Sequence, residues 1–213
     1  KKTLEKIVVQ EGEVVLGWRT VPVDNSCIGR TARETEPVIE QIFIGSAASA
    51  KKRAPLDLER RLYVIRKKVE NLIRSSALKQ KSYFYITNLS SRTFSYKGLL
   101  MTDQVEAFFV DLKDPRMQSA LALVHSRYST NTFPTWDLSQ PFRFLAHNGE
   151  INTLRGNINW LRAREGLLKT EVFGEDIKNI YPIVVPGGSD SATLDNVLEL
   201  IVLSGRPLYQ ALM

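Results

Sequence analysis

Apolar residues recur along this chain at two spacings, and each spacing predicts a different kind of element. Steps of three and four residues predict amphipathic helices, the longest of which runs from Leu56 to about Ile73 with a charged outer face. Shorter helices are predicted at residues 3–10, from about 150–153 to 165, from 189–191 to 205, and from 207 onward. The predicted strands are short runs rich in β-branched and aromatic residues, namely Glu13–Val23, Val38–Ile44, Lys81–Asn88, Arg92–Lys97, Leu121–Val124, Phe142–Ala146 and Val184–Gly188.

Strands with helices around them predict one layered domain of the α+β class. The runs Lys81–Asn88 and Arg92–Lys97 are close neighbours in the sequence, so we expect them to pair as a β-hairpin. Their aromatic side chains are expected in the core, although a row of aromatic rings is also what a base-stacking platform needs. Gly45–Pro55 is small and basic, which predicts a surface loop, and Thr102–Val105 is expected to form a helical turn.

Composition excludes some classes of protein. Apolar residues make up 43% of the 213 positions and charged residues 24%, as in ordinary soluble domains. No apolar run approaches the roughly 18 residues of a membrane span, and the charged start KKTLEK is not a signal peptide, so no membrane partner is expected. The net charge is +6, but acids alternate with the basic residues of Leu56–Ile73. This mixture favours a solvated helix face over a nucleic-acid site.

The single cysteine, Cys27, excludes a disulfide within these residues and suits a reducing compartment, the cytoplasm or a plastid stroma. Cys27 could also be read as a catalytic nucleophile. No histidine lies within ten residues of it, however, and an internal residue has no free α-amino group beside it. A structural or surface thiol is therefore the better interpretation.

Candidate chemistry is concentrated between residues 122 and 157. The predicted strand Leu121–Val124 continues into HSRYST, and the predicted strand Phe142–Ala146 continues into His147-Asn148-Gly149-Glu150. Polar side chains at the ends of strands are where rigid scaffolds commonly carry functional groups. The alternative is that both stretches are ordinary turns after strands.

Three stretches of the sequence carry a resemblance to a known family. HSRYSTNT, WDLSQPFRFLAHNGEINTLRGN and PGGSDSATLDNVLEL closely resemble the glutaminase domain of glutamate synthases, a class II glutamine amidotransferase. The resemblance implies a four-layer αββα sandwich of the N-terminal-nucleophile hydrolase type. It also implies hydrolysis of L-glutamine to glutamate and to ammonia, which is then used for reductive amination of 2-oxoglutarate.

The same resemblance assigns roles to five residues. Asn148 and Gly149 match the oxyanion hole, which uses an asparagine side-chain NH₂ and a glycine backbone N–H. Arg127 matches the arginine that holds the α-carboxylate of glutamine, Asp190 the acid that receives its α-ammonium group, and Thr130 a threonine that lines the pocket. On sequence alone, Asn-Gly is also a favoured turn, Asp190 a helix cap, and Arg127 a partner for any structural acid.

In this family the nucleophile is an N-terminal cysteine whose own α-amine moves the protons. The chain starts with Lys1, so we expect a partial domain, truncated at both ends, that lacks the nucleophile and hydrolyses no glutamine by itself. The resemblance further implies FMN and an iron–sulfur cluster in a synthase domain of the same parent chain. It also implies an electron-donor subunit or ferredoxin. No cofactor is expected within residues 1–213.

Two other functions remain open at this stage. His125, His147 and Glu150, with Asp190, could form a metal-dependent hydrolase centre, although the HxxE spacing is a weak signal. Alternatively, the chain could be a binding domain without catalysis, built on an amidotransferase scaffold.

Overall fold

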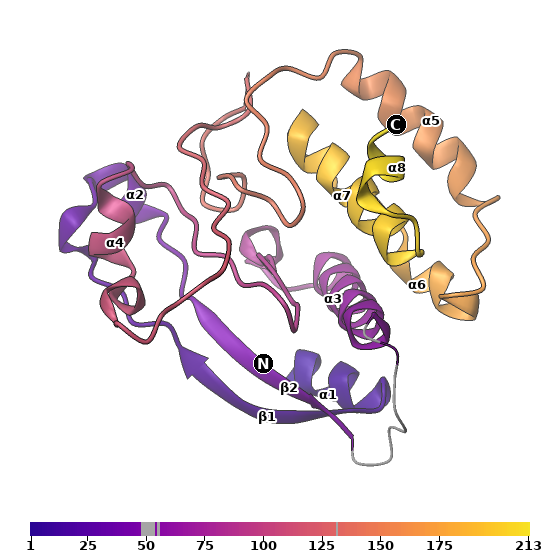
Figure 1. The fold of residues 1–213 in the computed structure, drawn as a ribbon, viewed down its shortest axis with the longest axis horizontal. Helices are drawn as coiled ribbons and strands as arrows, with labels where there is room; N and C mark the ends of the chain where they lie inside the picture. The colour runs from indigo at the N-terminus through magenta and orange to yellow at the C-terminus, as the bar shows by residue number, and fades with distance from the viewer. Residues whose placement is uncertain (48–53, 55, 131) are drawn as a thin grey trace.

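The computed structural model describes residues 1–47, 54, 56–130 and 132–213. Its longest helix, α3 (Asp57–Ser75), lies in the middle of the molecule, with the sheet and α1 (Lys2–Gln10) on one side and α7 (Asp190–Leu203) on the other (Figure 1). The other helices are α2 (Arg30–Glu34), α4 (Gln104–Phe108), α5 (Leu154–Glu165), α6 (Ile177–Ile180) and α8 (Leu208–Leu212). Most of the predicted loop Gly45–Pro55 lies outside the described residues.

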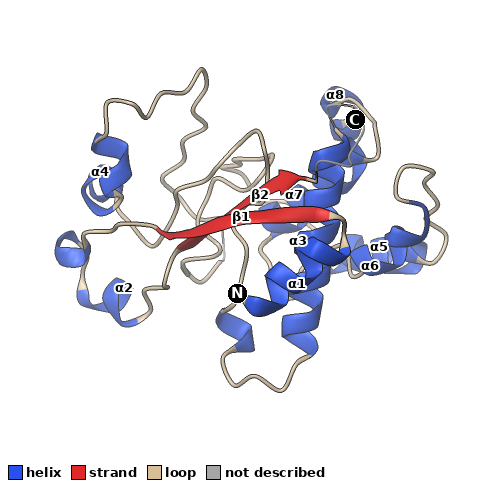
Figure 2. Ribbon diagram, turned by 90° about the horizontal axis from the view of Figure 1, so that it is seen from below, coloured by secondary structure: helices blue, strands red, loops and turns tan. Residues whose placement is uncertain are grey.

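The sheet consists of two antiparallel strands, β1 (Glu13–Thr20) and β2 (Glu40–Ser46). The register shifts between Val15 and Gly17, so that Leu16 has no partner on β2 and forms a bulge. One face of the sheet packs against α1 and α3, which lie on the same side of it (Figure 2). The predicted strands Glu13–Val23 and Val38–Ile44 are therefore confirmed, apart from their ends.

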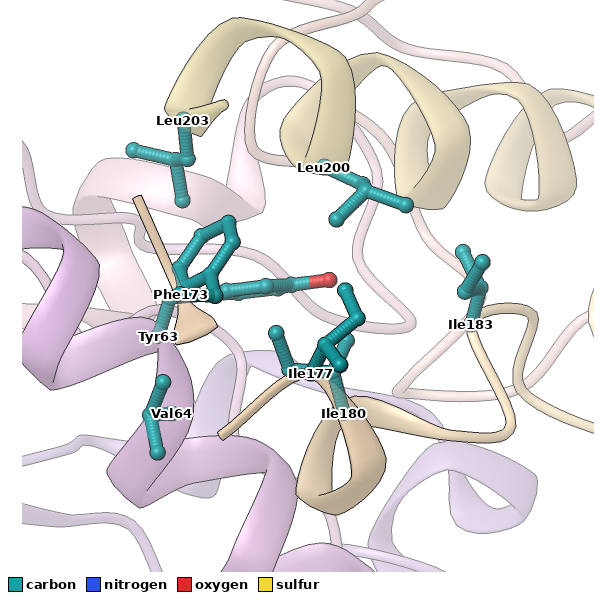
Figure 3. Packing of buried hydrophobic residues seen from close by; sticks show 8 residues of the cluster. All are labelled: Tyr63, Val64, Phe173, Ile177, Ile180, Ile183, Leu200 and Leu203. Carbon is teal, nitrogen blue, oxygen red and sulfur yellow. The ribbon is translucent and has the colours of Figure 1, made fainter. Parts of the chain in front are cut away.

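Helix α3 belongs to two hydrophobic clusters. Leu62, Ile65 and Val69 pack with α1 and the sheet. Tyr63 and Val64 pack instead with α6 and α7, where Figure 3 shows the Tyr63 side chain extending between Leu200 and Ile177. The periodicity that predicted this helix is confirmed, and its apolar residues serve both sides of the molecule.

A third cluster surrounds Trp136, which is only 4% exposed and contacts Phe108 at a ring-centroid distance of 5.4 Å. The Trp136 Nε1–H donates to the carbonyl of Ala32 at 3.1 Å. Cys27 packs at the edge of this cluster, and its Sγ–H donates to the carbonyl of Asp24 at 3.3 Å. The thiol therefore belongs to a packed part of the fold.

The predicted hairpin is wrong. Residues 81–83 form a turn of 3₁₀ helix, and residues 84–97 form no strand. A cavity of about 760 Å³ is lined by residues 83–91 and 93–97 together with β2. Aromatic and β-branched residues favour a strand only where a partner backbone completes the hydrogen bonds. In the described part of the chain this partner is absent.

The predicted strands Leu121–Val124, Phe142–Ala146 and Val184–Gly188 are also wrong as strands. Leu121 is 84% exposed and Val124 is 77% exposed, so their apolar side chains meet no core among the described residues. The Phe142 N–H donates to the carbonyl of Leu145 at 2.9 Å, which closes a turn. Two facing sheets are required for the αββα sandwich, and the described residues contain one two-stranded sheet. The structure therefore supports the α+β class, and the four-layer arrangement stays a prediction.

Helix α7 begins and ends where the sequence predicts, but its buried face is different. The apolar spacing of the sequence predicts a buried stripe of Leu194, Val197, Leu198 and Ile201, and of these four only Leu198 is buried. The buried residues of α7 include several polar and charged ones, namely Asp190, Ser191, Thr193, Asp195, Asn196 and Glu199. This helix carries polar chemistry into the interior. Among the described helices, none has the length and apolar content of a membrane span.

Candidate functional site

The N-terminus of α7 is built by a glycine turn and a serine cap. Gly187 has φ +81°, a left-handed conformation that glycine adopts without a Cβ clash. Ser189 is the N-cap, and its hydroxyl accepts from the Ala192 N–H at 3.1 Å. The first helical residue is therefore Asp190, which is 8% exposed.

The Asp190 carboxylate accepts several hydrogen bonds. Oδ2 accepts from the Ile151 N–H at 2.7 Å, and Oδ1 accepts from the Ser191 N–H at 2.6 Å. Burial raises the pKa of Asp190, but the hydrogen bonds from Ile151, Ser191 and Ser129 outweigh burial and bring the pKa below its ordinary value. Asp190 is thus held as an anion at neutral pH.

The loop containing Asn148 and Gly149 lies against this end of α7. One ring nitrogen of His147, Nδ1, lies 3.2 Å from the Ser191 hydroxyl. The Gln140 side chain binds the backbone of His147 twice: its Oε1 accepts from the N–H at 2.7 Å, and its Nε2 donates to the carbonyl at 2.9 Å. The loop therefore has fixed contacts just before its Asn-Gly pair.

Gly149 is the residue at which the backbone and the His147 ring approach closely. A Cβ at position 149 would lie 3.1 Å from both Cε1 and Nε2 of that ring, closer than most real Cβ contacts. Asn148 and Gly149 are themselves exposed. Their side-chain and backbone donors can therefore reach a bound molecule.

Arg127 and Thr130 come from a second segment. Both are exposed, and the Arg127 guanidinium has no partner among the residues that the structure describes. Between them, Ser129 is buried and its hydroxyl donates to the Ser189 hydroxyl at 3.3 Å. The segment therefore reaches the start of α7 through Ser129.

The five predicted site residues thus lie on three segments that meet at the N-terminus of α7. Asp190 and the Asn148-Gly149 loop are joined directly by the hydrogen bond from Ile151. In the part of the chain that the structure describes, Arg127 and Thr130 are joined to α7 through their neighbour Ser129, and neither forms a hydrogen bond or ion pair with Asp190.

A buried charge network lies deeper along α7. The Arg66 guanidinium donates to the Glu199 carboxylate and lies 3.3 Å from Glu70 Oε2, and all three side chains are nearly inaccessible to water. Arg143 lies nearby, with Nε 3.8 Å from Glu199 Oε1. Burial raises the pKa of Glu70, but the attraction of Arg66 and Arg143 brings it below its ordinary value. The network joins α3, α7 and the segment that leads to His147.

The metal-centre hypothesis is not favoured. Within residues 1–47, 54, 56–130 and 132–213, no three His, Cys, Asp or Glu side chains come close enough to hold a metal ion. His147 Nδ1 faces Ser191, and His125 Nδ1 lies 2.9 Å from the carbonyl of Arg127. The two histidines thus serve local contacts.

Sequence reasoning missed the polar residues that hold these segments together. Gln140 and Ser191 contact His147, Ser129 contacts Ser189, and Asp195 Oδ1 accepts from the Phe144 N–H at 2.7 Å. The signal that the sequence offers is a polar residue inside an otherwise apolar run. Asp195 and Asn196 interrupt the apolar pattern of α7.

Comparisons with known proteins find relatives along the whole chain. The family model "Glutamine amidotransferases class-II" matches residues 1–213. The large chain of glutamate synthase [NADPH] from Bacillus subtilis is 52% identical over 214 residues, which cover 100% of this chain and 14% of that protein. The glutamate synthase [NADH] of Schizosaccharomyces pombe is 49% identical over 91% of this chain and 9% of that protein.

A plant relative gives a similar result. The ferredoxin-dependent glutamate synthase 1, chloroplastic/mitochondrial, of Arabidopsis thaliana is 44% identical over the whole chain and 13% of that protein. The chain therefore spans about one seventh or less of the length of these relatives.

Proposed function

Because this chain belongs to the class II glutamine amidotransferases, we propose that it is the glutaminase part of a glutamate synthase, which hydrolyses L-glutamine to glutamate and ammonia. The observation that carries the proposal is the meeting of three segments at the N-terminus of α7. There, exposed Asn148 and Gly149 lie on a loop bonded to anionic Asp190, and the segment with Arg127 reaches the same helix end.

We assign the two ends of glutamine to two kinds of group. Asp190 receives the α-ammonium group, since its carboxylate is held as an anion, and a charge-assisted bond to an ammonium group is stronger than its present 3.2 Å bond from the Ser191 hydroxyl. Arg127 receives the α-carboxylate, since its guanidinium is exposed and can bind both oxygens at once. Thr130 lines the pocket beside it.

At the reacting carboxamide, Asn148 and Gly149 are the oxyanion-hole donors. Attack on the amide carbon places negative charge on its oxygen, and the Asn148 NH₂ and the Gly149 N–H stabilise that charge. Glycine at position 149 permits the close approach of the His147 ring that the loop already shows. Loss of one such donor typically lowers the rate about 10²- to 10³-fold.

We do not assign the nucleophile to Cys27. Its thiol packs at the edge of the Trp136 cluster and donates to the carbonyl of Asp24. In the family the nucleophile is an N-terminal cysteine, and we place it in a part of the protein outside these 213 residues. We propose that the 213 residues alone hydrolyse no glutamine, and that the four-layer αββα sandwich is the arrangement of the complete domain.

In the complete enzyme, the ammonia would be used for reductive amination of 2-oxoglutarate by a synthase domain of the same chain. FMN and an iron–sulfur cluster would belong to that domain, because the one cysteine of the present chain cannot ligate a cluster. The relatives' names give NADPH, NADH and ferredoxin as electron donors, so the donor stays open. We also propose a reducing compartment, the cytoplasm or a plastid stroma, because a single cysteine forms no disulfide within these residues.

The test is a pair of substitutions in the complete enzyme, each assayed with glutamine and with ammonium. Arg127→Lys keeps the charge but loses the two-pronged contact, so KM for glutamine should rise strongly. Asn148→Ala removes a donor used mainly in the transition state, so kcat should fall while KM changes little. Activity with ammonium should persist in both. If either variant loses both activities in parallel, the residue is structural and this assignment is wrong.

A further inference from the structure

Side chains of helix α7 bind the Asn148-Gly149 loop at both ends of the loop. Asp190 Oδ2 accepts from the Ile151 N–H on the C-terminal side, and Asp195 Oδ1 accepts from the Phe144 N–H on the N-terminal side, both at 2.7 Å. Residues 145–150 between these contacts have no helix or strand. Side chains of α7 therefore fix this segment where it begins and where it ends.

Gln140 holds the loop at a further position, His147. Its side chain takes both the N–H and the carbonyl of His147, the residue that immediately precedes Asn148. Gln140 is 5% exposed and Asp195 is fully buried. Buried polar side chains that bind backbone in this way have few alternative arrangements.

We propose that Asp195 and Gln140 are positioning residues for the oxyanion hole, holding Asn148 and Gly149 where the reacting carboxamide oxygen will lie. The inference rests on the proposed glutaminase function. It concerns two residues that need not touch glutamine, since their side chains bind backbone atoms of Phe144 and His147.

The chemistry explains why such residues are needed. Oxyanion donors act when they lie about 2.7–3.1 Å from the position of the developing charge. Asn148 and Gly149 are on an exposed, irregular segment, so a lost contact at either end allows the donors to move. A misplacement of about 1 Å in a catalytic geometry can lower the rate about 100-fold.

Asp195 needs only an acceptor oxygen for this task. Burial raises the pKa of Asp195, with opposition from Arg143, and Oδ2 has no hydrogen-bond partner among the described residues. Asparagine at this position keeps an acceptor oxygen for the Phe144 N–H. The conservative variant should therefore restore what alanine removes.

The experiment uses the complete enzyme and four variants: Asp195→Ala, Asp195→Asn, Gln140→Met and Leu194→Ala. Asp195→Ala should lower kcat with glutamine about 100-fold with KM changed less than threefold. Gln140→Met keeps the side-chain volume but removes both bonds to His147, so it should have the same kind of effect. Asp195→Asn should keep most of the kcat. Leu194→Ala truncates a neighbouring side chain of α7 and should keep kcat.

Each outcome bears on the proposal. A selective loss of kcat in Asp195→Ala and Gln140→Met, with ammonium-dependent activity retained, supports it. Full glutamine kcat in either variant overturns it, and so does an equal loss of both activities in Asp195→Ala, Asp195→Asn and Gln140→Met. If Asp195→Ala alone fails to fold, Gln140→Met decides. Failure of the proposed function is distinguishable, because then Asn148→Ala itself would keep full kcat.

Discussion

Because the network around Arg66 is buried, we expect replacement of one carboxylate by an amide to lower the free energy of unfolding substantially. Glu199→Gln keeps the shape of the side chain and removes its charge, leaving Arg66 with Glu70 alone at 3.3 Å. Removing one partner of a buried ion pair typically costs about 3–5 kcal/mol. Because Glu70 remains, we expect the lower end of that range, about 3 kcal/mol.

The assay is urea unfolding of the 213-residue chain at pH 7, with the free energy of unfolding obtained by linear extrapolation. A loss of about 3 kcal/mol corresponds to a fall in Tm of roughly 6–12 °C for a chain of this size. Glu175→Gln is the matched control, since its pair with Lys178 is exposed at the surface. The control should leave the unfolding curve unchanged.

A double substitution separates an unpaired charge from lost packing. Arg66→Met with Glu199→Leu replaces the pair by apolar side chains of similar size, which in other proteins is often neutral or stabilising. We expect it to recover at least half of the loss in Glu199→Gln. A cost below 1 kcal/mol for Glu199→Gln, or no recovery in the double variant, would refute the reasoning.

Two further predictions concern packing and pH. A Cβ at Gly98 would lie 2.5 Å from Trp136 Cζ3, so Gly98→Ala should cost about 1–3 kcal/mol in urea unfolding, whereas Gly166→Ala, with nothing within 4 Å, should cost nothing measurable. Burial, with repulsion from Arg143, lowers the pKa of Lys97 to about 7, so the unfolded chain binds a proton between pH 7 and about 10 that the folded chain lacks. The free energy of unfolding should therefore rise with pH across this window, and Lys97→Met should reduce the slope by about 1.4 kcal/mol per pH unit. An unchanged slope in the variant contradicts that pKa.

The helices could be predicted because their signal is local. Leu62, Ile65 and Val69 repeat at helical spacing in α3, and this spacing can be read without knowing which residues they pack against. Strands depend on partners elsewhere in the chain. Leu121–Val124 has the composition of a buried strand, yet its side chains are mostly exposed because no described segment pairs with it.

The residues of the candidate site could be predicted from the sequence, but the residues that hold them in place could not. Asn148, Arg127 and Asp190 occur in stretches whose sequence is informative by itself. The importance of Asp195 depends on the Phe144 N–H, which is 51 residues away. The burial of Glu199 likewise depends on Arg66, which is 133 residues away. A periodicity argument cannot include such distant charges, so it assigned α7 an apolar face that the structure leaves partly exposed.

The central position of α3 has a consequence for how the molecule unfolds. Its Leu62 and Ile65 belong to the cluster with the sheet, and its Tyr63 and Val64 to the cluster with α6 and α7. Opening either side exposes one flank of the same helix, so the two halves are energetically coupled. Amide protons in the middle of α3 should consequently be the last to exchange with solvent deuterium, at the rate of whole-molecule opening.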